Sequence, residues 1–146
     1  MLRITKRIDS GEPAKTLTLP LDMRLKSRVK VLLDDGGEAG LFLERGRILR
    51  HGDLLQSACG MVIEVHAAPE SVSAVYCDDA LQLARACYHL GNRHIPLEIA
   101  DGRVAYQPDH VLDDMVRGFG LEPRVEIAPF EPEAGAYGDH PGHGHG

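Results

Sequence analysis

Residues 72–127 read VSAVYCDDALQLARACYHLGNRHIPLEIADGRVAYQPDHVLDDMVRGFGLEPRVEI, and their patterns alternate between strand and helix. Two segments place apolar residues at the i, i+3, i+4, i+7 spacing of a helix that is buried on one side. The first follows Asp78, the expected N-cap, and ends at Gly91, whereas the second starts at Pro108-Asp109 and ends at Gly120. Strands are expected over residues 72–77, 95–99, 103–107 and 124–127. The order β–α–β–β–α–β predicts a ferredoxin-like domain.

The preceding half of the chain shows the two-residue alternation of strands. Leu17, Leu19 and Leu21 alternate with Thr18 and Pro20. Short apolar runs follow at residues 28–33, 41–43, 47–49 and 61–65, and turns rich in Gly and Asp separate them. These features predict a small all-β sandwich or barrel, so that the whole chain belongs to the α+β class.

A change of composition near residues 67–71 separates the two halves. We therefore expect a β-rich domain over residues 1–68 and a ferredoxin-like domain over residues 69–130. From about Pro129 onward the chain consists largely of Pro, Gly, Glu and His. This composition predicts a disordered tail, residues 131–146, because it offers little apolar surface to bury.

The charge is unevenly divided between the two halves. Residues 1–68 contain eleven Lys and Arg against nine Asp and Glu, whereas residues 69–146 contain five against thirteen. The acidic second half disfavours nucleic acid as a partner, because phosphate would be repelled. It is compatible with binding a cation, although acidic surface also serves solubility alone.

The cysteines and the N-terminus indicate a soluble cytoplasmic protein. The three cysteines, Cys59, Cys77 and Cys87, are odd in number and lack CxxC spacing, so we expect small buried side chains and no disulfide framework. The first ten residues, MLRITKRIDS, lack the apolar core of a signal peptide. No apolar run approaches the roughly 18 residues that a membrane helix needs, so no membrane association is expected.

The clearest chemical signal is the terminal string DHPGHGHG. His140, His143 and His145 lie within six residues of one another, Asp139 adds a carboxylate, and Gly and Pro separate them. Imidazole binds nickel, copper and zinc, so the string predicts a metal-binding segment. An expression tag is the plain alternative, but a tag normally has contiguous histidines.

Three further histidines are candidate ligands in the second half. His94 lies in the turn after the first expected helix, His89 lies in the last turn of that helix, and His110 lies at the start of the second helix. Each also has a purely structural interpretation, as a turn residue, a cation at a helix C-terminus and part of a solvated face. One histidine alone binds nickel weakly, but a two-fold dimer would supply the same histidine twice near its axis.

The stretches YHLGNRHIP (residues 88–96) and YQPDHVLDDMVRGFG (residues 106–120) resemble the UreE family of urease accessory proteins. The resemblance implies a homodimer in which an N-terminal domain binds peptide and a C-terminal domain hands Ni²⁺ to apo-urease during assembly. It implies an interfacial ligand at His94 and peripheral ligands at His89 and His110. It further implies other urease accessory proteins as partners, including the accessory GTPase. Some family members have a histidine where this chain has Pro108.

Three other functions remain open at this stage. A zinc or copper storage protein would use the same ligands, and copper would outcompete nickel at most such sites. An RNA-binding module would need paired aromatics on a basic sheet, whereas the expected hairpin offers only Tyr106. An enzyme could pair Ser71, Ser73 or Cys87 with His89, but no nucleophile elbow or phosphate loop accompanies them, so we expect no catalytic activity.

Overall fold

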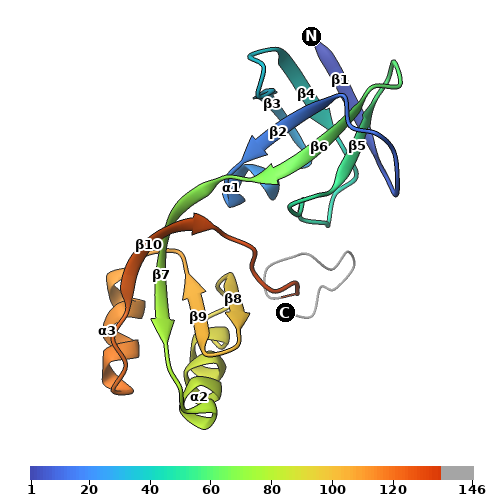
Figure 1. Ribbon diagram of the computed structural model, residues 1–146. Coiled ribbons are helices and arrows are strands. Elements are labelled where there is room, and N and C mark those ends of the chain that lie inside the picture. The colour runs from blue at the N-terminus through green and yellow to red at the C-terminus, as the bar shows by residue number, and fades with distance from the viewer. Residues whose placement is uncertain (136–146) are drawn as a thin grey trace. The chain divides into compact units, whose positions relative to one another are not determined.

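The computed structural model describes residues 1–135 and divides into two compact units (Figure 1). One unit contains Met1–Ala68 and the other contains residues 69–135. The first is rich in strands and the second combines a sheet with two helices, so the predicted α+β class is confirmed. No helix in the described part of the chain is long and apolar enough to span a membrane.

The N-terminal unit is a six-stranded sheet with one short helix. Its strands follow the order β2-β6-β5-β1-β4-β3, with parallel pairs β1–β4 and β2–β6 and antiparallel pairs elsewhere. The elements are β1 (Leu2–Ile8), β2 (Lys15–Leu19), α1 (Leu21–Arg24), β3 (Arg28–Leu32), β4 (Glu38–Phe42), β5 (Leu54–Ser57) and β6 (Val62–Ala67).

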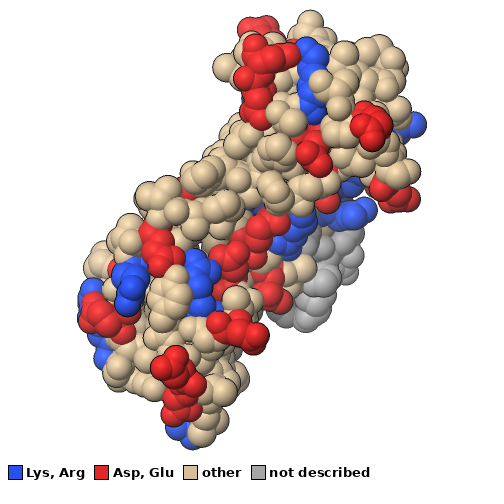
Figure 2. Space-filling view, in the orientation of Figure 1, with Lys and Arg blue, Asp and Glu red and all other residues tan. Residues whose placement is uncertain are grey.

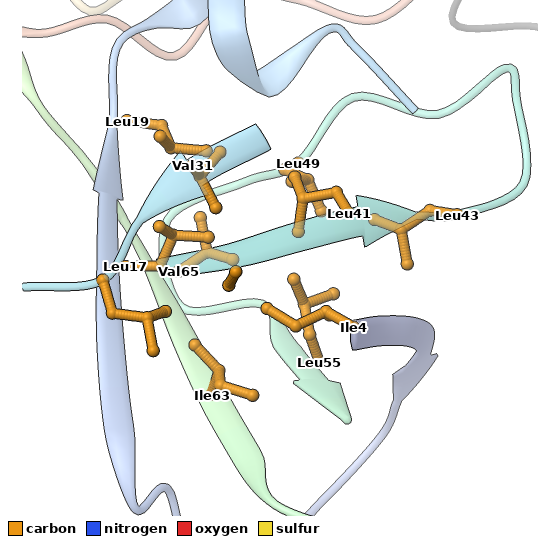
Figure 3. Close-up of a cluster of buried hydrophobic side chains, with 12 residues drawn as sticks. Ile4, Leu17, Leu19, Val31, Leu41, Leu43, Leu49, Leu55, Ile63 and Val65 are labelled. Atoms are coloured by element: carbon orange, nitrogen blue, oxygen red, sulfur yellow. The ribbon is translucent and has the colours of Figure 1, made fainter. Parts of the chain in front are cut away.

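Aliphatic side chains from every strand of this sheet meet in one core (Figure 3). Ile4, Leu17, Leu41 and Leu55 are among those without solvent exposure. Their alternation with polar neighbours sends one face of each strand inward. The expected strand through Leu21 stops at Leu19, because Pro20 has no N–H to donate and instead precedes α1.

The expected strand at residues 47–49 is wrong. Ile48 and Leu49 are buried, but they belong to the loop between β4 and β5. Leu49 is held there from both ends: its N–H donates to Arg24 O, and its own carbonyl accepts from the buried guanidinium of Arg24. A short apolar run therefore marks burial here without marking a strand.

The C-terminal unit has the element order β–α–β–β–α–β. Its antiparallel sheet follows the order β10-β7-β9-β8. The elements are β7 (Pro69–Tyr76), α2 (Ala80–Gly91), β8 (Leu97–Ala100), β9 (Arg103–Tyr106), α3 (His110–Gly118) and β10 (Arg124–Pro129). Val75, Val104 and Tyr106 form a buried cluster with Leu83 and Leu90 of α2, together with Leu112 and Val116 of α3.

Two further expected details are wrong, one in each unit. Asp79, not Asp78, caps α2, because its extended backbone lets its carboxylate accept from Leu81 N and Gln82 N.

Cys59 is exposed in the turn before β6, whereas Cys77 and Cys87 are half-buried. All three are free thiols, but the prediction that each is a small buried side chain fails for Cys59.

The expectation of disorder from about Pro129 onward is also wrong for residues 129–133, whereas residues 136–146 of the expected tail lie outside the described residues. β10 continues to Pro129, and Phe130 has no solvent exposure. Glu131 N then donates to the Glu98 carboxylate, and Glu133 N donates to Leu97 O. Residues 130–133, the C-terminal strap, therefore lead from β10 at one edge of the sheet to β8 at the opposite edge.

The strap contacts the face of the sheet that the helices leave open, because Glu98, which accepts from Glu131 N, is paired with Ala105 on that face. Val72, Ala74 and Ala105 are fully buried although they alternate with the residues that face α2 and α3. A chain segment that crosses this face would bury them. Beside them, Arg103 pairs with Glu98 and Glu126, and basic and acidic side chains lie next to each other on the surface of this unit (Figure 2).

Candidate metal-binding site

Helix α2 positions two of the candidate histidines. Leu83, Ala86 and Leu90 form its buried side, whereas His89 lies in the last turn on the exposed side. Asn92 is the C-cap of the helix, and its N–H donates to Tyr88 O. In the turn that follows, Arg93 N donates to Leu90 O and His94 N donates to Gly91 O. These turn hydrogen bonds place His94 directly beyond the helix end.

His94 has a left-handed backbone. Its φ of 56° makes it the one non-glycine residue with positive φ among residues 1–135. This region costs an L-residue with a Cβ atom roughly 1–2 kcal/mol. The imidazole is exposed, and no hydrogen bond or ion pair engages it within residues 1–135. Strain at an exposed, unengaged imidazole is a feature found at functional sites.

His89 lies against aromatic rings. Its ring centroid is 5.0 Å from that of Phe119, at the end of α3, and 5.2 Å from that of Tyr88. Gln82 Nε2 donates to Phe119 O at 3.0 Å and so joins the two helices beside this contact. A shallow hollow lined by Asp79, Arg85, His89 and Phe119 lies here. These contacts favour a fixed orientation of the His89 ring.

His110 is the first residue of α3 and is exposed. Asp109 caps this helix, with its carboxylate accepting from Val111 N at 2.8 Å and Leu112 N at 3.3 Å. The carboxylates three and four residues later are engaged elsewhere. Asp113 accepts from Tyr106 Oη at 2.6 Å, and Asp114 pairs with Arg117. His110 therefore has no ready carboxylate partner on its own helix for a shared metal.

The Tyr106–Asp113 hydrogen bond belongs to the scaffold of this region. Burial, followed by the bond to Asp113, raises the pKa of Tyr106 far above its usual value. The phenol therefore stays protonated and donates at any physiological pH. It connects the middle of the sheet, through β9, to the first turn of α3, where His110 lies.

The single chain does not assemble a complete metal site in its described part. Within residues 1–135, no three His, Cys, Asp or Glu side chains come together in a way that could hold a metal ion. His140, His143 and His145 lie outside the described residues. Ligands for a tight site would have to come from a second copy or from these terminal histidines.

The left-handed backbone at His94 is the feature of the site that sequence reasoning missed. A weak signal was available in Gly91–Pro96. Pro96 disfavours a helical conformation for Ile95, and Ile95 packs against the core, so the chain has to leave the helical path between Gly91 and Ile95. Helix α2 does end at Gly91, as expected, but Gly91 is its last helical residue and not the left-handed C′ residue, because Asn92 is the C-cap and the positive φ falls on His94.

Comparison with known families decides the identity. The model of the UreE urease accessory protein N-terminal domain matches residues 3–68, and that of the UreE C-terminal domain matches residues 70–146. The chain belongs to the UreE family. The family is one of urease accessory proteins, which supports a role in urease maturation.

Individual UreE relatives are similar over almost the whole chain. The urease accessory protein UreE of Alkalilimnicola ehrlichii is 60% identical over 94% of this chain and 85% of its own length. UreE of Pseudomonas putida strain W619 is also 60% identical, over 94% of this chain and 86% of its own length. UreE of Citrobacter koseri is 55% identical over 99% of this chain and all of its own length.

Proposed function

We propose that this UreE-family chain is a nickel metallochaperone that binds Ni²⁺ through histidines and delivers it for assembly of the urease active site. The observation that supports it most is His94, an exposed and unengaged imidazole held at a strained backbone position just after α2. Imidazole nitrogen is a suitable ligand for Ni²⁺, and the UreE family supplies the link to urease.

The proposed site is shared between two copies of the chain. A homodimer formed through the C-terminal domains would bring two His94 imidazoles to one axis, and His89, His110 or the terminal histidines would add further ligands. Two imidazoles leave most positions of an octahedral ion to water. An acceptor protein can then exchange ligands one at a time and remove the Ni²⁺, which a fully enclosed site would not permit.

The two domains take separate parts in this proposal. The C-terminal domain, whose strand order and element order agree with a ferredoxin-like architecture, carries nickel and dimerises. The N-terminal domain binds a peptide segment of a partner in the cytoplasm, with urease apoprotein and the accessory GTPase as the proposed partners. The free thiols Cys59, Cys77 and Cys87 are compatible with a reducing compartment.

Calorimetric titration with Ni²⁺ tests the proposal. We expect wild-type protein to bind Ni²⁺ tightly, and His94→Gly to lose the tightest site without unfolding. The matched control is His66→Gln. His66 lies in the N-terminal unit, where it hydrogen-bonds Glu64, so this substitution should leave Ni²⁺ binding unchanged. Tight Ni²⁺ binding that survives in His94→Gly would refute the assignment. A parallel titration in which only Zn²⁺ or Cu²⁺ binds tightly would favour a storage protein.

A further inference from the structure

One outer sheet face of the N-terminal unit concentrates cations. Strand pairing aligns Arg3 of β1 and Lys30 of β3 on either side of Gly40, and aligns Arg28 of β3 with Phe42 of β4. Directly paired residues lie on the same face of a sheet. The intervening residues Ile4, Val31 and Leu41 belong to the core, so this face is turned away from it.

Phe42 lies close to the backbone at the centre of this face. A Cβ atom placed on Gly40 would come within 2.8 Å of the Phe42 ring and 3.2 Å of the Met1 side chain. Gly40 is accordingly buried although it points away from the core. The absence of a side chain at Gly40 therefore lets the Phe42 ring approach the sheet, where it forms a half-exposed aromatic surface.

Two guanidinium groups use this aromatic surface. Arg3 Cζ lies 4.2 Å from the Phe42 ring centroid, and Arg28 Cζ lies 5.8 Å from it. A guanidinium held over a ring keeps its in-plane N–H donors available for a carboxylate. The ring thereby reduces the conformational freedom that each arginine would lose on binding an anion.

These cations have no acidic partner in the described part of the chain. Arg7 and Lys15 of the same unit pair with Asp53 and Asp35, whereas no ion pair forms at Arg3, Arg28 or Lys30. The three are exposed. We call Arg3, Arg28, Lys30 and Phe42 the cationic face. Its positive charge is available to a group from outside the chain.

We propose that the cationic face binds an acidic, extended segment of a partner protein. Arg3 and Lys30 are separated by two strand spacings, roughly 10 Å. Alternate residues of an extended chain project carboxylates from one side about every 7 Å, within reach of these long, flexible side chains. This proposal deepens the peptide-binding role proposed above by assigning it a surface and a charge. A long nucleic-acid backbone fits less well, because the chain as a whole has a net charge of −6.

Fluorescence anisotropy with a fluorescein-labelled octapeptide of alternating Glu and Val tests the proposal. Arg28→Glu/Lys30→Glu should weaken binding about tenfold or more, since charge reversal makes each contact repulsive. Lys26→Glu/Arg45→Glu alters the charge equally at exposed positions outside the face and should change binding less than about twofold. Phe42→Leu should also weaken binding while leaving every charge in place, because Arg3 loses its ring.

Several results would overturn the proposal. These are no binding of the peptide by wild-type protein, equal weakening by the two charge-reversed variants, and equal binding of a peptide in which Gln replaces Glu. Tighter binding of labelled oligothymidine would assign the face to nucleic acid instead. If Arg28→Glu/Lys30→Glu unfolds by circular dichroism, Arg28→Gln/Lys30→Gln replaces it. Nickel titration of the same variants should match wild type, so failure of this proposal and failure of nickel binding are distinguishable.

Discussion

At the scale of single residues, substitution can separate the two properties of His94. His94→Gly removes the imidazole and the backbone strain together, whereas His94→Ala removes the imidazole and keeps a Cβ at φ 56°. We expect the glycine variant to be about 1 kcal/mol more stable than the alanine variant, and both to lose tight Ni²⁺ binding. Urea unfolding and nickel titration measure the two effects.

A control for this comparison is available at the start of α3. His110→Gly should be less stable than His110→Ala, because a helix position favours Ala over Gly. If Gly is more stable than Ala at position 94 but less stable than Ala at position 110, the left-handed backbone of His94 is the cause of the difference. Equal stability of His94→Gly and His94→Ala would contradict the strain at this residue.

Asp34 shows a second residue-scale effect, in the N-terminal unit. Its carboxylate accepts hydrogen bonds from Thr16 Oγ1 at 2.6 Å, Thr18 Oγ1 at 2.8 Å and Thr18 N at 3.1 Å. Burial acts to raise the pKa of Asp34, but these hydrogen bonds outweigh it and hold the pKa below its usual value. The ionised carboxylate thus connects the end of β3 to β2, the opposite edge strand of the sheet.

We expect Asp34→Ala to lower the free energy of unfolding at pH 7 by about 1 kcal/mol, the size of an exposed hydrogen-bond cluster. Since the folded-state pKa is depressed, this stabilisation is present above the unfolded pKa of about 3.9 and is lost as pH falls through the folded pKa. The difference between variant and wild type should therefore narrow below about pH 4. Asp35→Ala, which breaks an exposed pair with Lys15, should cost less. A pH-independent difference at Asp34 would argue against the charged form as the cause.

At the scale of secondary-structure elements, the C-terminal strap makes the strongest prediction. Phe130 is fully buried in a small unit, so Phe130→Ala should lower the free energy of unfolding by about 3 kcal/mol or more. Val125→Ala on the neighbouring strand β10 is the control, because Val125 is 69% exposed and should change stability by less than about 0.5 kcal/mol. Denaturant unfolding followed by circular dichroism measures both.

Two truncated chains distinguish the contribution of the strap to stability from that of the residues beyond it. A chain ending at Pro129 should be destabilised as strongly as Phe130→Ala, whereas a chain ending at Gly135 should unfold like the full-length protein. Comparable stability of the two truncated chains would show that the strap contributes nothing.

The strap also shows which elements the sequence could predict. Regular spacing identified α2 and α3, because their buried faces depend on residues within one helix. The strap has no periodicity, and its ordering depends on Leu97 and Glu98, more than thirty residues earlier in the chain. The prediction of disorder from the composition after Pro129 was therefore wrong for residues 130–133. The strand predicted at residues 47–49 was wrong for the same reason, because Leu49 is positioned by a hydrogen bond from Arg24, which is distant in the sequence.

At the scale of the whole molecule, two domains were expected from the composition change near residues 67–71. The structure divides between Ala68 and Pro69, and β7 begins at Pro69 with almost no linker. The candidate site was less predictable. Sequence named His89, His94 and His110, but the structure brings no three potential ligands together within residues 1–135. Sequence spacing could not predict this, because which ligands meet depends on contacts distant in the chain.

The dimer predicted through the C-terminal half belongs to this scale. Light scattering at micromolar protein should give twice the mass of the 15.9 kDa chain with and without Ni²⁺. His94→Gly should leave this mass unchanged, because one exposed turn residue contributes little packing. A monomer in all conditions would eliminate a site shared between two His94 residues.

Deletion of the residues after Tyr137 tests the terminal histidines. We expect the deleted protein to remain dimeric and to bind fewer Ni²⁺ ions, because Asp139, His140, His143 and His145 are removed while the strap is kept. X-ray absorption at one equivalent of Ni²⁺ then reports whether the first ion has lost imidazole ligands. An unchanged number of bound ions would remove these histidines from the mechanism.

The strap also determines where the terminal histidines are tethered. Glu133 is hydrogen-bonded to Leu97, and Leu97 is only three residues from His94, a contour of about 10 Å. His140 is seven residues from Glu133, so its tether spans at most about 25 Å. If His140 binds Ni²⁺ as proposed, chain connectivity alone limits the ion to about 35 Å from His94, which corresponds to an effective concentration in the millimolar range. Lengthening the chain between Glu133 and His140 should dilute that local supply, so the rate of nickel loading would depend on tether length even if every ligand were unchanged.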